Sequence, residues 1–283
     1  MVRSLELTVL VDDSVSPTGQ GLTAKHGLSI HAEFEAEDKR FSLLVDTGPS
    51  DVVIQNAGAL HVDLGGIKAV FLSHGHYDHI GGLIGVLKKV NTRLPVIAHP
   101  RVFEPKIKFT PFLRYIGSPF RQAEVEANGG LVLLARNSVP LMMGVSTTGE
   151  IERATSYEKS SGFWTISRER FIEDILTDDQ ALMFKVEGKG LVIVSGCAHA
   201  GIINTIWQSK KIMDVEKVYA VIGGFHLVDA DEERLKLTLE DLLQIDPEFI
   251  HPCHCTGSKA VSMLKKDFGD RCVPLKTGDS ITI

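Results

Sequence analysis

The chain has 283 residues, of which 43% are hydrophobic and 23% are charged, and its formal net charge is −6. This length suits one large α/β domain or two small ones, and a domain of this size buries its core without disulfides or a structural metal. The acidic balance argues against a nucleic-acid partner, and no apolar run is long enough to span a membrane. The first residues lack the apolar stretch of a signal peptide, so we expect a cytoplasmic protein with reduced cysteines.

The N-terminal third is predicted to contain short strands separated by turn residues. Strand patterns cover residues 5–11, 28–34, 41–45 and 67–72. Helical patterns cover residues 51–60 and 80–90. The strand at 67–72 runs directly into a polar segment that begins at Ser73, and a helix follows that segment. This arrangement places polar side chains on a loop at the end of a buried strand.

Residues 100–177 differ in character from the rest of the chain. They are rich in proline, glycine and aromatic residues and contain only short strand-like pieces. Long irregular segments inside a compact domain are usually functional covers or linkers. The aromatic content is too high for a disordered linker. We therefore predict an inserted cover segment that packs over the active site.

Regular elements return after residue 180. Residues 181–186 and 191–195 form a predicted hairpin around Gly188, Lys189 and Gly190. Further strands are expected at 218–222, 248–250 and 280–283, and helices at 201–213, 231–244 and 257–268. Both halves of the chain combine strands with strand–helix units, which predicts two sheets with helices outside them. We treat residues 1–283 as a single domain of the α/β class.

The run from His74 to His79 carries the strongest chemical signal. It contains four candidate metal ligands, His74, His76, Asp78 and His79. In extended backbone, His74 and His76 point the same way and can share one ion, whereas Asp78 and His79 lie past the bend and can face a second. Imidazole and carboxylate groups together suit zinc, iron or manganese. A histidine-rich turn formed by chance would require the ligands, the strand and the helix to coincide.

This run, together with residues 43–48 (LLVDTG), resembles the signature of the metallo-β-lactamase superfamily. Further segments resemble the branch of dihydropterin-ribofuranosylaminobenzene phosphate synthase-like proteins. They are residues 10–13 (LVDD), 25–29 (KHGLS), 195–201 (SGCAHAG), 223–227 (GGFHL) and 252–257 (PCHCTG). The resemblance implies a four-layer αββα sandwich with two divalent metal ions at one edge of the two sheets. Zinc is the default metal, and iron or manganese would use the same groups.

The resemblance also implies further ligands. His199 is the candidate for the first ion and His254 for the second, with a helix-capping or core histidine as the alternative for each. The sequence departs from the superfamily pattern in two places. Asp178 stands near the position of a histidine motif, and Cys197 stands near that of the bridging aspartate. Cys197 is thus either a metal ligand or a plain buried thiol.

Other residues are candidates for supporting roles. His226, after two glycines, is a candidate general acid beside the catalytic Asp78, or a packing residue. Asp46 either orients a ligand histidine or forms a turn. His26, Glu158 and Arg153 are weaker candidates for substrate contacts, and Glu158 and Arg153 suit solvated positions equally well.

Three functions follow from this pattern. The first is hydrolysis of a phosphoester, lactone or similar bond by water that two metal ions activate. The second, implied by the narrower resemblance, is a transferase that condenses a pterin pyrophosphate with ribofuranosylaminobenzene phosphate. The third is a non-hydrolytic redox or binding protein. The expected partner is a small molecule, phosphorylated or pterin-like, and the sequence is compatible with a homo-oligomer.

Overall fold

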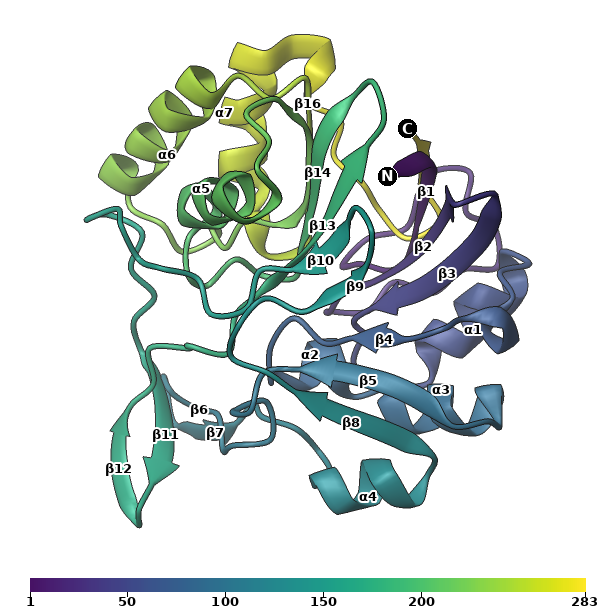
Figure 1. Cartoon of the computed structure of the whole chain (residues 1–283). Helices are drawn as coiled ribbons and strands as arrows, with labels where there is room; N and C mark the ends of the chain where they lie inside the picture. Colours follow the sequence, from purple (N-terminus) through teal and green to yellow (C-terminus); the bar gives the residue numbers. More distant parts are fainter.

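The computed structural model describes residues 1–283, and its strands form two layers with helices on their outer faces (Figure 1). The strands follow the order β16-β15-β14-β13-β1-β2-β3-β4-β5-β8. β1 (Val2–Val11) and β13 (Ala181–Val186) pair only through Val2 and Val186. This single pair joins two sheets, one from each half of the chain.

The N-terminal sheet continues from β1 through five more strands. These are β2 (Ser29–Ala36), β3 (Lys39–Val45), β4 (Val70–Phe71), β5 (Leu94–Ala98) and β8 (Gly130–Leu134), and β17 (Ser280–Thr282) pairs with β1. The C-terminal sheet contains β13 and the strands that follow it. These are β14 (Gly190–Ser195), β15 (Val218–Gly224) and β16 (Phe249–Cys253), with β10 (Val145–Thr147) and β9 (Pro140–Met142) on the other side of β13.

Helices cover the outer face of each sheet. Those beside the N-terminal sheet are α1 (Val52–Ala59), α2 (Tyr77–Ile80), α3 (Leu83–Val90) and α4 (Gln122–Ala127). Those beside the C-terminal sheet are α5 (Ile202–Met213), α6 (Glu232–Ile245) and α7 (Ser258–Phe268). None of these helices is both long and apolar enough to cross a membrane.

Three hydrophobic clusters lie between the four layers. The cluster between the two sheets has 25 buried residues, and the clusters between each sheet and its helices have 20 and 19. Alternation along β1 produces this division, because Leu7 and Val9 face the other sheet whereas Leu10 faces α1 and α3. The predicted four-layer αββα sandwich is therefore confirmed.

Residues 100–177 divide between the main layers and a separate four-stranded sheet. The small sheet has the order β12-β11-β6-β7, with bounds β6 (Ile107–Phe109), β7 (Leu113–Tyr115), β11 (Phe163–Ser167) and β12 (Arg170–Glu173). β8, β9 and β10 instead extend the edges of the main sheets, which would otherwise have unpaired backbone groups. Only part of the aromatic-rich insert therefore lies beside the site.

Candidate metal centre

The site lies where several strands end at one edge of the two sheets. Asp46 follows β3, and the 74–79 run follows β4. Cys197 and His199 follow β14, and His226 and His254 follow β15 and β16. β3 is parallel to β4, and β14 is parallel to β15 and β15 to β16, so their carboxyl ends meet at this edge.

Several of these residues adopt left-handed backbone conformations. The φ angles are 56° at Asp46, 51° at Ala198, 47° at His226 and 47° at His254. Positive φ is uncommon for residues other than glycine, and such residues cluster at functional sites. Each one turns the chain sharply as it leaves its strand, which directs the next side chains into the same space.

The first set of candidate donor atoms comes from three histidines. His76 Nδ1 lies 2.9 Å from His74 Nε2 and 3.2 Å from His199 Nε2. All three side chains are buried. The structure thus brings the predicted ligand His199, from the other half of the chain, to the two histidines of the 74–79 run.

The second set joins a carboxylate to two histidines. His79 Nε2 lies 3.3 Å from His254 Nε2, and Asp78 Oδ2 lies 3.8 Å and 3.5 Å from these two nitrogens. Burial alone would raise the pKa of Asp78, but the neighbouring His79 and His254 hold it well below its ordinary value. Asp78 is therefore a carboxylate at neutral pH and offers a negatively charged ligand.

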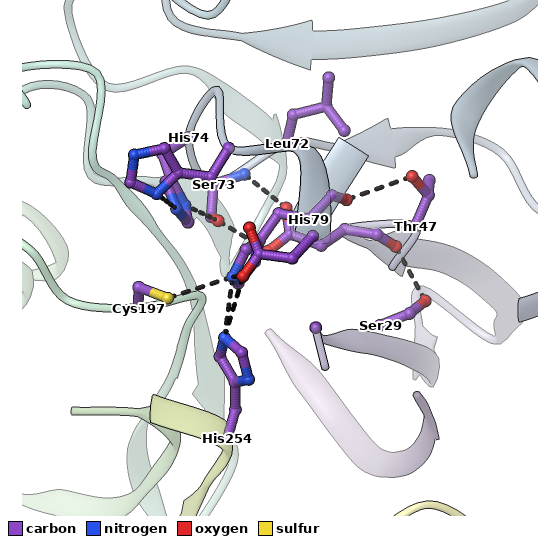
Figure 2. A network of polar contacts seen from close by, with 12 residues as sticks. Ser29, Thr47, Leu72, Ser73, His74, His79, Cys197 and His254 are labelled. Atoms are coloured by element: carbon purple, nitrogen blue, oxygen red, sulfur yellow. Dashed lines mark hydrogen bonds and ion pairs between the residues drawn. The ribbon is translucent and has the colours of Figure 1, made fainter. Parts of the chain in front are cut away.

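Cys197 lies between the two sets. Its Sγ is 3.1 Å from His79 Nε2, and Figure 2 shows Cys197 and His254 both directed toward His79. The donor atoms of Cys197, His74 and His79 all lie within 4.8 Å of one another. Burial raises the pKa of the Cys197 thiol well above its ordinary value. The thiol thus stands where it can contact ligands of both sets.

Asp46 orients the histidines from behind. Its Oδ2 accepts hydrogen bonds from His79 Nδ1 and from Ser73 Oγ, each at 2.6 Å, and its Oδ1 accepts one from Ser73 N at 2.7 Å. Because Ser73 Oγ uses its proton on Asp46, it accepts from His74 Nδ1 at 2.9 Å. Both rings therefore present the lone pair of Nε2 to the donor sets (Figure 2).

Asp13 does the same for His254. Its Oδ1 accepts from His254 Nδ1 at 2.7 Å, and its Oδ2 contacts His26 Nδ1 at 2.9 Å. Asp12 Oδ1 accepts from the backbone N–H of His254 at 2.7 Å. Both aspartates lie in the segment 10–13, which was notable only for its family resemblance, so neither had a predicted role.

The donor atoms fit divalent cations. Burial lowers the pKa of His74 and His199 well below the ordinary value, and that of His76 to about 4. The three rings are therefore neutral, and His76 Nδ1 faces two other nitrogens that one proton cannot serve together. A cation would satisfy all three at once. In the second set, Asp78, two histidines and a thiol supply the donor types that zinc, iron and manganese accept.

A cavity of about 320 Å³ opens onto both donor sets. His26, Asp78, Cys197 and His226 line it, as do ligand candidates from each set. Its other wall comes from the small sheet and includes Lys108, Arg114 and Phe163. Neither Lys108 nor Arg114 had a predicted site role, and Phe163 counted only as one aromatic residue of the insert.

His26 and His226 both line this cavity, and each adjoins a different donor set. The His26 side chain is 60% exposed, and its Nε2 lies 3.4 Å from Asp78 Oδ2. The His226 ring lies 4.1 Å from that of His199, and its buried Nδ1 has no hydrogen-bond partner. His226 thus adjoins the first donor set and keeps one nitrogen free for a ligand.

Glu158 and Arg153 do not line the cavity. The Glu158 carboxylate accepts hydrogen bonds from Ile203 N at 2.9 Å and Asn204 N at 3.0 Å, so it caps the N-terminus of α5. Arg153 donates to the carbonyl oxygen of His199 at 3.1 Å. Both side chains support the backbone around His199, and neither was predicted to do so.

A buried ion network joins the small sheet to the 74–79 loop. Lys106 Nζ, just before β6, donates to Asp178 Oδ1 at 2.6 Å and to Asp174 Oδ2 at 2.9 Å. Asp178 Oδ2 accepts from Gly75 N at 2.9 Å, and Asp179 Oδ2 accepts from Ala200 N at 2.8 Å. The two adjacent aspartates thus hold the loops that carry His74, His76 and His199.

The αββα fold, with candidate ligands gathered at the edge of its two sheets, defines a class of metal-binding enzymes. The chain belongs to the metallo-β-lactamase superfamily, whose family model matches residues 35–254. The resemblance predicted from the 74–79 run is therefore confirmed.

Three relatives span nearly the whole chain. It is 36% identical over 265 residues to 7,8-dihydropterin-6-methyl-4-(β-D-ribofuranosyl)-aminobenzene-5′-phosphate synthase of Methanocaldococcus jannaschii, covering 91% of this chain and 90% of the relative. An uncharacterized protein of the same organism is 30% identical over 260 residues, covering 92% and 94%. The crystal structure of a metal-dependent hydrolase of the beta-lactamase superfamily matches with a TM-score of 0.83 at 26% identity and covers 98% of both chains. These relatives include both a synthase and a hydrolase.

Proposed function

We propose that this protein is a metal-dependent hydrolase with a dinuclear centre that acts on a phosphoester, lactone or similar bond of a small molecule. One observation carries the proposal. Two sets of three donor atoms lie close together, and members of both sets line a cavity that is open to a small molecule, as does Cys197. The match to the metallo-β-lactamase superfamily supports a metal-dependent reaction of this class. The similarity to the structure of a metal-dependent hydrolase supports it as well.

The donor sets divide the ligands between the two ions. His74, His76 and His199 would hold the first ion, and Asp78, His79 and His254 the second. Cys197 is the candidate for a ligand shared by both, and zinc is the default metal. Divalent ions at such sites lower the pKa of water toward neutrality and stabilise negative charge on the bond that is attacked.

The chain's own residues then handle protons and orientation. His226 lies beside the first donor set, and its free Nδ1 is placed to give a proton to the leaving group. Asp78 stays ionised at neutral pH, so it remains available as a negatively charged ligand of the second ion. Asp46 and Asp13 fix the tautomers of three ligand histidines, so these rings need no reorientation during turnover.

A transferase is the second candidate, because the synthase relative is 36% identical across nearly the full length of both chains. The same donor sets would then face a departing diphosphate rather than a water molecule. Phe163, on the cavity wall, would contact the flat ring of a pterin.

The test uses full-length protein loaded with zinc, iron or manganese, and measures turnover of phosphodiester, lactone and pterin pyrophosphate substrates. We expect at least one substrate to be hydrolysed, and His76→Ala or Asp78→Asn to lower kcat by roughly 10³-fold or more. Asp267→Asn, at an exposed position on α7, is the matched control and retains the wild-type rate.

The outcomes separate the candidates. Product formed from a single substrate and water supports the hydrolase, whereas diphosphate release that requires a second substrate supports the transferase. Wild-type turnover in the doubly substituted His76→Ala/Asp78→Asn protein contradicts both. A metal-loaded protein that is inactive on the whole panel would instead favour the non-hydrolytic redox or binding function.

A further inference from the structure

The small sheet forms the wall of the cavity that faces the donor sets. Lys108 on β6 pairs in register with Arg114 on β7 and with Phe163 on β11. Side chains at paired positions of neighbouring strands lie on the same face of a sheet. All three line the cavity. The small sheet thus presents one row of two cations and one aromatic ring to the candidate metal centre.

Two cations at directly opposed positions repel each other and weaken strand pairing. The protein itself offsets little of this charge. Lys108 Nζ lies 3.9 Å from a carboxylate oxygen of Asp229, which is 79% exposed. Arg114 Nη2 donates only to the neutral carbonyl of Thr110, at 3.1 Å. The row therefore carries more positive charge than the one exposed carboxylate beside it balances.

Lys106 provides a comparison within the same strand region. It lies two residues before Lys108, and it is 1% exposed with two carboxylates within 3 Å of Nζ. Where this segment uses a lysine for structure, the chain supplies a full set of anionic partners. Lys108 and Arg114 have no such set of carboxylates. An anion from outside the protein would therefore pair with their positive charges.

We propose that Lys108 and Arg114 form a subsite for a phosphate group of the substrate, separate from the bond that is cleaved. A phosphate monoester carries between one and two negative charges at neutral pH and three acceptor oxygens, which matches one ammonium and one guanidinium group. Phe163, whose ring lies 5.4 Å from that of His76 and 5.5 Å from Lys108 Nζ, packs against the part of the substrate between the phosphate and the metal centre.

This inference rests on the proposed function, because it assigns the substrate of the same cavity to small molecules that carry a phosphate in addition to the reactive bond. A cavity of about 320 Å³ accommodates a ligand at the small end of the usual range. The subsite suits both candidate reactions, since a phosphorylated substrate is compatible with hydrolysis and with condensation.

Binding is tested without turnover, on the metal-loaded full chain. The probe is phenylphosphonate. Benzyl alcohol, which has a similar ring but no charge, is the comparison ligand. The Kd of each compound is measured by calorimetry. In the Lys108→Met/Arg114→Gln protein, the Kd of phenylphosphonate should rise roughly tenfold or more, because two charge-assisted contacts are lost. The Kd should also rise with salt in the wild type and less so in the variant.

The control is Lys88→Met/Arg93→Gln, which removes the same charges from exposed positions near the end of α3 and should leave the Kd unchanged. Metal analysis and circular dichroism verify that both variants are loaded and folded. If the Lys108→Met/Arg114→Gln protein binds phenylphosphonate as tightly as the wild type, the metal centre alone holds the anion and the subsite is overturned.

A second readout keeps this proposal distinct from the proposed function. The measurement uses two substrates that differ only in a distal phosphate. The kcat/KM of the phosphorylated substrate, divided by that of the unphosphorylated one, should fall roughly tenfold in the Lys108→Met/Arg114→Gln protein. An unchanged ratio overturns the subsite while the proposed function stands. Absence of any turnover, together with the loss of phenylphosphonate binding, rejects the proposed function and supports the subsite.

Discussion

At the scale of single residues, Asp46 shows how a side chain behind the donor sets orients candidate ligands in both of them. Asp46 is fully buried and accepts three hydrogen bonds, from the backbone and hydroxyl of Ser73 and from His79. Through Ser73 it also sets the tautomer of His74. One carboxylate therefore controls a histidine in each donor set.

We expect Asp46→Asn to weaken metal binding without unfolding the protein. The NH₂ group of the asparagine would stand where Asp46 Oδ2 accepts from the Ser73 hydroxyl and the His79 ring. Both groups would then lose their acceptor. Metal affinity should fall roughly 10–100-fold, as measured by competition with a chelator. Asp267→Asn is the control, and equal affinity in the two proteins would show that Asp46 is not an orienting residue.

The candidate ligands are easier to find in the sequence than the residues that surround them. The 74–79 run is local, so its ligand types and spacing can be read directly. His199 and His254 were reached through the resemblance to a family. Lys108 and Arg114 could not be found in this way, because their common face depends on the register of β6 and β7, two strands of three residues each. Such short strands leave almost no alternating pattern.

At the scale of elements, the loop between β4 and α2 is fixed by close packing as well as by its ligands. A Cβ atom on Gly75 would lie 2.2 Å from the carbonyl oxygen of Val102. The Gly75 N–H also donates to Asp178 Oδ2. The loop that carries His74 and His76 therefore has one position against the neighbouring backbone.

Gly75→Ala should displace this loop and lower both metal affinity and stability. The contact is with backbone that cannot move away cheaply, so we expect a loss of about 1–3 kcal/mol in the free energy of unfolding, measured with urea. Gly58→Ala in α1, where an added Cβ meets nothing within 4 Å, is the control and should stabilise the protein by about 0.5–1 kcal/mol. Equal effects of the two substitutions would contradict this account.

Most strands of the main sheets were predicted, but β5 and the short edge strands β9 and β10 were not. β2 was found from its alternating sequence, and β3 from the apolar run at its buried end. The aromatic residues of the insert were expected to cover the site, but Phe109, Phe112 and Tyr115 are 55–64% exposed. Phe109 follows Lys108 on β6 and therefore points away from the cavity. Composition alone cannot show which face of a short strand is turned inward.

At the scale of the whole molecule, the hydrophobic core does not depend on the candidate metal centre. The three clusters of 25, 20 and 19 buried residues lie between the four layers, whereas the donor atoms lie at one edge. Folding and metal binding should therefore be separable, unlike in small domains that fold only around a metal.

Removing metal with a chelator should abolish activity and leave a cooperatively folded protein. Thermal unfolding followed by circular dichroism should keep one transition, and the metal should add about 2.7 kcal/mol of stability when its free concentration is 100 times Kd. Activity should return when zinc, iron or manganese is added back. Loss of the folded signal on chelation would show that the ions are structural.

The buried Lys106 network has a consequence for how molecules enter and leave. Because Lys106 ties the root of the small sheet to Asp174 and Asp178, this sheet cannot swing as a hinged lid without separating charges in a dry environment. Motion that widens the cavity entrance is then confined to the tips of the β6–β7 and β11–β12 hairpins. The cavity entrance should accordingly limit the size of the ligands that enter, so that bulky compounds do not reach the candidate metal centre.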